Sequence, residues 1–200
     1  GYSQPLTEKI KLDMGGKANF RRISSRSDVL GLQPESGKYA FDPNLSNRLT
    51  YHQQVYALYS EISLPVADLF DLKIGGRYER TELSTYFSNV AAQATEPGYN
   101  TWVPSVFLMK KLSDRHTIKL SYSKRIERPD YRDLNPFVNT TDPKNISTGN
   151  PYLKPEIGNR LEFSYSYDMN SSGFIMLSAF YRTSKDDIQP YIVYYPELSV

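Results

Sequence analysis

Several residue types that build common functional sites are absent or rare in this chain. The 200 residues contain no cysteine, which excludes disulfides, thiol nucleophiles and cysteine-ligated zinc. The two histidines, His52 and His116, fall in different predicted hairpins, which favours neither a histidine metal site nor a catalytic triad. We therefore expect no catalytic residue, no metal site and no cofactor.

Long apolar runs and an excess of one charge are also missing. No apolar run approaches the roughly 18 residues of a transmembrane helix, and the chain opens without the charged and apolar regions of a signal peptide. The 24 basic and 22 acidic residues are interspersed and give a net charge of +2. Nucleic-acid binding usually needs a concentrated basic face, so we expect no nucleic-acid partner.

What the chain has instead is an alternation of apolar and polar residues. In residues 9–21, every second side chain is apolar or small, and the residues between them are mostly charged. Successive side chains of a strand point to opposite faces of a sheet, so this pattern predicts a strand with one apolar and one charged face.

The same pattern recurs along the chain. The predicted strands span residues 9–21, 49–62, 70–87, 100–112, 117–126, 160–169 and 174–185. Short turns alternate with longer polar segments, and long loops are predicted at 28–46, 89–99, 127–159 and beyond 187. This organisation predicts an all-β, antiparallel up-and-down meander of about seven long strands with negligible helix.

Alternation alone leaves two interpretations open. Strands of roughly 10 to 18 residues are long enough to cross a bilayer at a tilt, with apolar side chains facing lipid. A soluble barrel would reverse this polarity and place its apolar side chains inside. In the membrane interpretation, the side chains that face lipid include Ile10, Leu12, Leu72, Ile74, Leu120 and Phe163.

The segment between the strands 117–126 and 160–169 carries a family resemblance. It reads RPDYRDLNPF at 128–137, DP at 142–143 and GNPYLKPE at 149–156. These motifs resemble the C-terminal barrel region of TonB-dependent outer-membrane receptors, in particular the outer-membrane β-barrel family common in Bacteroidetes. The positions that we assign to the motif itself are Arg125, Pro129, Asp133, Pro136, Asp142, Gly149, Pro151, Pro155 and Glu156.

The resemblance implies that residues 1–200 are part of a large transmembrane β-barrel, without plug domain, TonB box or signal peptide. It implies the bacterial outer membrane as location, and active uptake of a scarce nutrient as function. The implied partners are outer-membrane lipid, a nutrient ligand of unspecified identity and the TonB complex, engaged through a part outside these residues. A non-transporting binding or scaffold barrel is the alternative, and a soluble β-barrel is a third possibility.

In the resembling receptors the motif segment leaves the barrel rim as an extracellular loop, and such loops often carry ligand contacts. The candidate ligand-binding residues are Arg128, Tyr131, Arg132, Asn135, Phe137, Asn150 and Tyr152. The charged members of the cluster could form an anion site, but we expect them to pair with one another. These charged residues are Arg125, Arg128, Asp130, Arg132 and Asp133.

Tyrosine is unusually frequent, with 17 residues. Aromatic rings with polar tips favour the two interfaces of a membrane, so we expect Trp102 and Tyr78 in an outer belt and Tyr59 and Tyr167 in an inner one. Cross-strand packing of aromatic side chains is the alternative explanation. An open sheet also leaves two edges unpaired, and we expect this chain on its own to self-associate through them.

Overall fold

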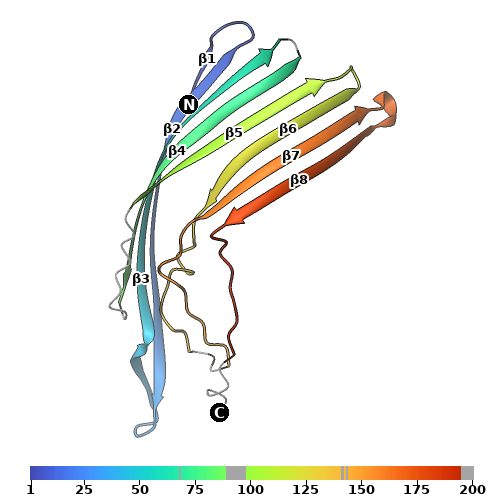
Figure 1. Ribbon diagram of the computed structural model, residues 1–200. Helices are drawn as coiled ribbons and strands as arrows, with labels where there is room; N and C mark the ends of the chain where they lie inside the picture. Colours follow the sequence, from blue (N-terminus) through green and yellow to red (C-terminus); the bar gives the residue numbers. More distant parts are fainter. Residues whose placement is uncertain (68, 89–97, 141, 143, 195–200) are drawn as a thin grey trace.

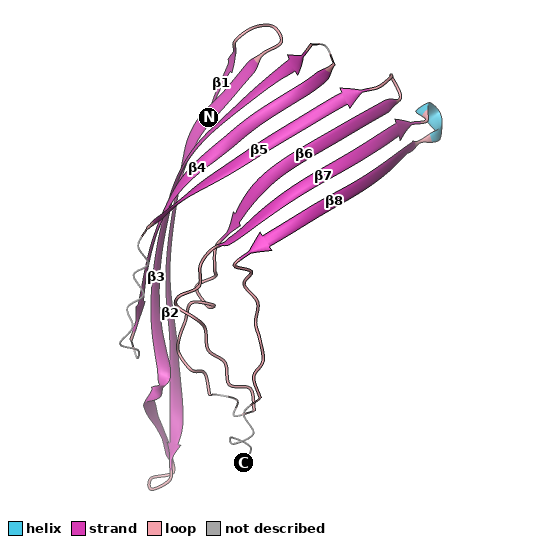
Figure 2. Cartoon of the chain, in the orientation of Figure 1, coloured by secondary structure: helices cyan, strands magenta, loops and turns pink. Residues whose placement is uncertain are grey.

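The chain forms one curved antiparallel sheet (Figures 1 and 2). The computed structural model describes all residues except 68, 89–97, 141, 143 and 195–200. The eight strands follow each other in the sheet in chain order. They are β1 (Tyr2–Pro5), β2 (Lys11–Gln33), β3 (Lys38–Val66), β4 (Phe70–Phe87), β5 (Tyr99–Lys111), β6 (His116–Glu127), β7 (Glu156–Asp168) and β8 (Phe174–Lys185).

The described residues contain one helical turn, the three-residue 3₁₀ turn Asn170–Ser172 between β7 and β8. The all-β antiparallel meander predicted from the sequence is therefore confirmed. Strands β1 and β8 do not pair with each other in the described part of the chain, so the sheet is open.

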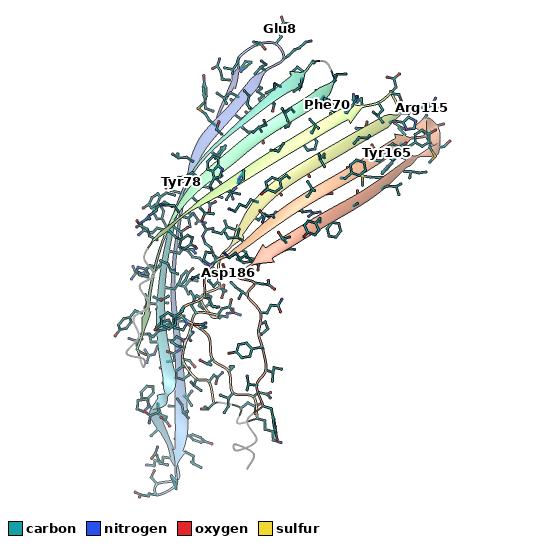
Figure 3. The ribbon with its side chains drawn as sticks, in the orientation of Figure 1. Glu8, Phe70, Tyr78, Arg115, Tyr165 and Asp186 are labelled. Atoms are coloured by element: carbon teal, nitrogen blue, oxygen red, sulfur yellow. The ribbon has the colours of Figure 1, made fainter. Side chains whose placement is uncertain are left out.

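Short connections gather at one end of the sheet. Figure 3 shows Glu8, Phe70 and Arg115 at this end, whereas Asp186 lies at the opposite end of β8. In the turn before β8, Gly173 has a φ of 117°, a conformation that favours glycine. The long β6–β7 connection lies at the other end, as the alternation of short and long connections predicted.

The predicted loop at residues 28–46 is wrong, because most of it is strand. Strands β2 and β3 stay paired to Gln33 and Lys38 and turn through Gly37, which has a φ of 61°. The register is interrupted between Ser27 and Val29 and then resumes. The reason is that this region still alternates, with Leu30 opposite Phe41 and Leu32 opposite Tyr39. The resulting hairpin, residues 28–46, projects beyond the other strands as an arm (Figure 1).

The strands predicted at 9–21 and 49–62 are too short, because β2 and β3 continue into the arm. The five predicted strands from residue 70 onward agree with β4 to β8 within four residues, and 70–87 and 174–185 match β4 and β8. Strand β1 was not predicted, because four residues are too few to show a period. The predicted loop 89–99 lies mostly outside the described residues. The same applies to Pro143 of the motif and to the end of the predicted segment beyond 187.

Cross-strand register keeps like side chains on the same face from β2 to β8. One register line is almost wholly apolar and consists of Leu12, Ile62, Ile74, Val106, Tyr122, Leu161 and Tyr181. The next line is polar or small and consists of Asp13, Glu61, Gly75, Ser105, Ser123, Arg160 and Arg182. We call the sides that carry these lines the apolar face and the polar face.

An aromatic row bounds the apolar face toward the long connections. It consists of Phe20, Tyr56, Tyr78, Trp102, Tyr122 and Tyr181. Tyr78 and Trp102 are direct cross-strand partners, and the rings of Phe20 and Tyr56 meet edge to face at 5.7 Å. On each of these strands, the next residue on the same face toward the long connections is polar. These residues are Arg22, Gln54, Arg80, Asn100, Lys124 and Thr183. The apolar band thus ends along one line across the sheet.

The assignment of Tyr59 to an aromatic belt is wrong. Tyr59 is paired with Gly15 and Arg77, which places it on the polar face. Its ring occupies the space that a side chain at position 15 would need, since a Cβ there would lie 2.4 Å from the Tyr59 hydroxyl oxygen. Tyr167 lies on the apolar face opposite Ile175, near the short turns.

Candidate functional site

The long β6–β7 connection folds back over the polar face. We call residues 128–155 the docked segment. In Figures 1 and 2 its described residues lie on the concave side of the sheet, between β3 and the chain that follows β8. The docked segment contacts β2, β3 and β4. These strands are not neighbours of β6 and β7, which flank the segment and pair only with β5, β8 and each other.

Arg128 anchors the start of the docked segment to β4. Its guanidinium forms an ion pair with Glu79 and donates from Nε and Nη2 to Oγ1 of Thr81 at 3.2 and 2.8 Å. Glu79 is only 5% exposed and also accepts from Nε of Arg77 at 2.5 Å. A buried carboxylate needs such paired cations, because removal from water penalises its charge. This contact is therefore a specific anchor and not a surface ion pair.

Two further contacts extend the docking. The ring of Tyr131 lies 6.4 Å from that of Tyr51 in β3, and Tyr51 is 1% exposed. Asp130 lies 3.9 Å from Arg21 of β2. Leu134 is buried to the same degree as Tyr51. Tyr51 of the sheet and Leu134 of the docked segment are therefore both shielded from solvent.

The docked segment has a fixed internal frame. Gly149 donates its N–H to the Asn135 carbonyl at 2.7 Å, and Asn150 donates to the Asp133 carbonyl at 2.7 Å. A Cβ at position 149 would lie 2.4 Å from the Asp133 oxygen, so only glycine fits this crossing. Asn139 and Ser147 pair as an isolated antiparallel bridge. These bonds join the two halves of the segment.

Asparagine and aspartate side chains close its turns. Asn135 accepts from the Phe137 N–H at 3.2 Å, and Asn150 accepts from the Tyr152 N–H at 3.0 Å. Asp142 accepts from the side-chain amide of Asn145 and from the backbone N–H of Lys144, and these bonds lower the pKa of Asp142.

The expectation that the charged cluster pairs internally is wrong. Within the described residues, no ion pair shorter than 4 Å joins two of its members; Arg128 and Asp130 instead pair with Glu79 and Arg21 on the sheet. Arg132 donates from Nε to the Tyr131 hydroxyl at 3.1 Å. Arg128 and Asp130 find their partners on the sheet because the segment folds inward.

The candidate ligand-binding residues divide into two groups. Arg128, Asn135 and Asn150 are engaged within the protein, as anchor or turn formers. Arg132 and Tyr152 are exposed, Tyr152 to 70%, and Tyr131 and Phe137 are partly exposed. Accessible side chains for a ligand are therefore found at these four positions.

The motif residues also have separate places. Pro129 and Pro151 are buried, Pro136 and Pro155 are partly buried, and Asp133 accepts from the Asp130 N–H at 3.1 Å. Glu156 is buried at the start of β7, where it accepts from the Ser184 hydroxyl and lies 3.8 Å from Arg182. Arg125 lies on the polar face of β6 and is exposed.

Sequence reasoning did not identify the partners of the docked segment on the sheet, namely Arg21, Tyr51, Glu79 and Thr81. Strand periodicity places all four on the polar face, and this was the available signal. It does not tell which distant segment covers them.

This geometry agrees with the comparison to protein families. The family model described as "Outer membrane protein beta-barrel family" matches residues 1–199. The chain belongs to this family. The predicted resemblance to the barrel region of TonB-dependent outer-membrane receptors is confirmed, and the chain's location is the bacterial outer membrane.

Among solved structures, OprC shows the same fold. The copper transporter OprC matches with a TM-score of 0.60 and 19% identity, over 87% of this chain and 27% of OprC. The ferric preacinetobactin receptor BauA from Acinetobacter baumannii matches with a TM-score of 0.48 and 16% identity, over 87% of this chain and 26% of BauA. The siderophore receptor PirA from Pseudomonas aeruginosa matches with a TM-score of 0.42 and 13% identity, over 91% of this chain and 44% of PirA. This chain thus spans about a quarter of the length of OprC.

No curated protein sequence matches the chain significantly. In the described part of the chain, no helix is long and apolar enough to span a membrane. The same residues contain no group of three or more histidine, cysteine or acidic side chains arranged to hold a metal ion.

Proposed function

We propose that this chain forms part of the wall of a TonB-dependent outer-membrane receptor that takes up a scarce nutrient. The docking of residues 128–155 on the polar face carries the proposal. The segment is charged and lies against the polar face, and in outer-membrane barrels polar side chains face the interior while apolar side chains face lipid. The polar face therefore lines the interior, and the opposite face contacts lipid.

The apolar face supports this orientation. Ile74, Leu120 and Phe163 are exposed in the sheet, and lipid is the environment that would cover them. The aromatic row would mark the outer interface, where ring and hydroxyl meet apolar and polar surroundings. Tyr78 and Trp102 of the predicted outer belt both lie in this row.

The docked segment would narrow the interior and offer its exposed side chains to the nutrient. Arg132 and Tyr152 are accessible, while Arg128 fixes the segment to the wall through Glu79. Ligand contacts would thus come from a loop held in place and not from a mobile one. Energy would be supplied by the TonB complex through a part of the protein outside these residues.

The test is a nutrient-limited growth comparison. A strain that lacks the complete gene is grown with iron, cobalamin, a glycan or a peptide as the limiting nutrient, with and without TonB. We expect slower growth on one nutrient, restored by the wild-type gene only when TonB is present. Wild-type growth of the deletion strain on every nutrient that requires TonB-dependent uptake would contradict the proposal.

The arm supports a second candidate function, an outer-membrane barrel that binds a partner without transport. Its cross-strand pairs Leu30–Phe41 and Leu32–Tyr39 are more than half exposed, and they project beyond the docked segment. Exposed apolar patches often mark protein interfaces. Loss of partner capture after removal of the arm, with no growth defect in the deletion strain, would favour this candidate.

A further inference from the structure

The polar face carries an arginine cluster that the docking of residues 128–155 does not use. Arg160 of β7 and Arg182 of β8 are direct cross-strand partners. Arg125 of β6 lies on the same face, two residues beyond Ser123, the cross-strand partner of Arg160. Like charges directly opposite each other in a sheet are destabilising, so this arrangement costs folding free energy. A bound anion would offset that cost.

The three arginines line one cavity of about 460 Å³. The ring of Phe180 supports the guanidinium of Arg160, with its central carbon 5.5 Å from the ring centroid. The two ends of the docked segment's flanking strands, Glu127 and Glu156, also line the cavity. The hollow therefore opens beside the docked segment.

Two of the arginines already have a carboxylate partner. Arg160 lies 2.9 Å from Glu162, and Arg182 lies 3.8 Å from Glu156. Arg125 is exposed and has no ion-pair partner within 4 Å among the described residues. Its guanidinium is therefore the free cation of the cluster.

A second hollow of about 670 Å³ adjoins the first, because Arg125 and Ile126 line both. The floor of the second hollow is made of the small residues Gly75, Ser105 and Ser123, which are successive cross-strand partners. Lys17 and Arg77 stand at its far side. The combined groove thus has cations at both ends, Arg125 in the middle and hydroxyl groups along its floor.

We propose that this groove binds a small anion bearing carboxylate or phosphate groups, with Arg125 as the principal contact. Guanidinium groups match the oxygens of both anions in a bidentate geometry. The inference rests on the proposed function, because it assigns the groove to the interior of the receptor and names the chemical class of its ligand. The hydroxyls of Ser105 and Ser123 would donate to further oxygens of the same molecule.

The experiment is calorimetric titration of the protein, produced from its complete gene and purified in detergent. Citrate and pyrophosphate are the two probes, and sodium chloride of equal ionic strength is the blank. Saturable binding of either probe is expected, and the tighter one identifies the carboxylate or the phosphate class. Arg125→Gln should weaken the tighter probe at least about tenfold.

A second variant serves as the matched control. Lys119→Gln removes the same charge from the same face of β6, at a position outside both hollows. It should change affinity less than about twofold. If Arg125→Gln does not assemble, Arg182→Gln takes its place with the same expectation.

Absence of saturable binding by both probes would overturn the proposal. So would an equal loss of affinity in Arg125→Gln and Lys119→Gln, because net charge would then suffice to explain it. If the growth test supports uptake but neither probe binds, only the anion-binding inference is contradicted, and the proposed function stands. The two proposals can therefore fail separately.

Discussion

Arg128 and Glu79 are 49 positions apart in the sequence and form an ion pair on the polar face of the sheet. The pair joins the end of β6 to the middle of β4, across β5. Both side chains are largely buried, and Thr81 and Arg77 complete their hydrogen bonds. This contact holds the start of the motif segment against the polar face.

Arg128→Ala should release the docked segment. The substitution leaves Glu79 buried with Arg77 as its remaining cation, a loss of about 3 kcal/mol for a broken buried pair. Limited trypsin digestion should then cut faster at Lys144, which is followed by Asn145. Arg132→Gln, at an exposed position, is the control and should leave the rate at Lys144 unchanged. Equal rates in Arg128→Ala and wild type would contradict the anchor.

Ile74→Arg should impair membrane insertion, whereas Lys73→Arg should be nearly silent. Ile74 is in the middle of the apolar register line, and Lys73 is its neighbour on the polar face. An arginine facing lipid near the midplane costs about 2 to 4 kcal/mol. Refolding into lipid vesicles in a urea series measures the difference. Equal destabilisation by both substitutions would refute the assigned polarity.

Gly149→Ala should destabilise the docked segment by about 1 to 3 kcal/mol, because its methyl group would overlap the Asp133 carbonyl. Gly158→Ala is the matched control, since its nearest neighbour would be the Thr183 oxygen at an ordinary 3.8 Å. Hydrogen exchange of the Gly149 and Asn150 region should increase only in the first variant. Unchanged protection there would show that the crossing tolerates a side chain.

Replacing the arm, residues 28–46, by a two-residue turn should leave the thermal midpoint of the barrel nearly unchanged. Beyond Leu49, whose partner is Phe87, β3 pairs only with β2, so the arm stabilises no other strand. Thermal unfolding in detergent, followed by circular dichroism, is the measurement. A drop of more than roughly 5 °C would mean that the arm contributes to the stability of the wall.

The strands could largely be predicted from the sequence, because the alternation of apolar and polar residues is a local signal. It is present wherever one face of a strand is apolar. Residues 70–79 of β4 alternate in this way, and β4 and β8 both have the predicted bounds. The arm was missed because proline, glycine and charge at residues 34–38 look like a loop even though the flanking residues pair. Tyr59 was misplaced because β3 has apolar residues of both parities near it, including Ala57 and Leu58.

The docked segment shows the limit of such reasoning. Its turns follow from Asn, Asp and Gly at fixed offsets, and the motif indicated a shaped loop. Its direction does not follow, because the pairing of Arg128 with Glu79 depends on how the sheet curves. Local periodicity contains no information about the distance between Arg128 and Glu79 in space. For this reason the expected pairing within the charged cluster was wrong.

The orientation of the two faces is the central claim, and single cysteines can be introduced into these 200 residues, which contain none of their own. Single substitutions Ile74→Cys and Lys73→Cys, each carrying a nitroxide spin label, are compared in lipid vesicles by electron paramagnetic resonance. The account predicts that oxygen, which concentrates in lipid, relaxes the label at 74, and that a water-soluble nickel chelate relaxes the label at 73. The reverse pattern, with the chelate reaching 74 and oxygen favouring 73, would contradict the account.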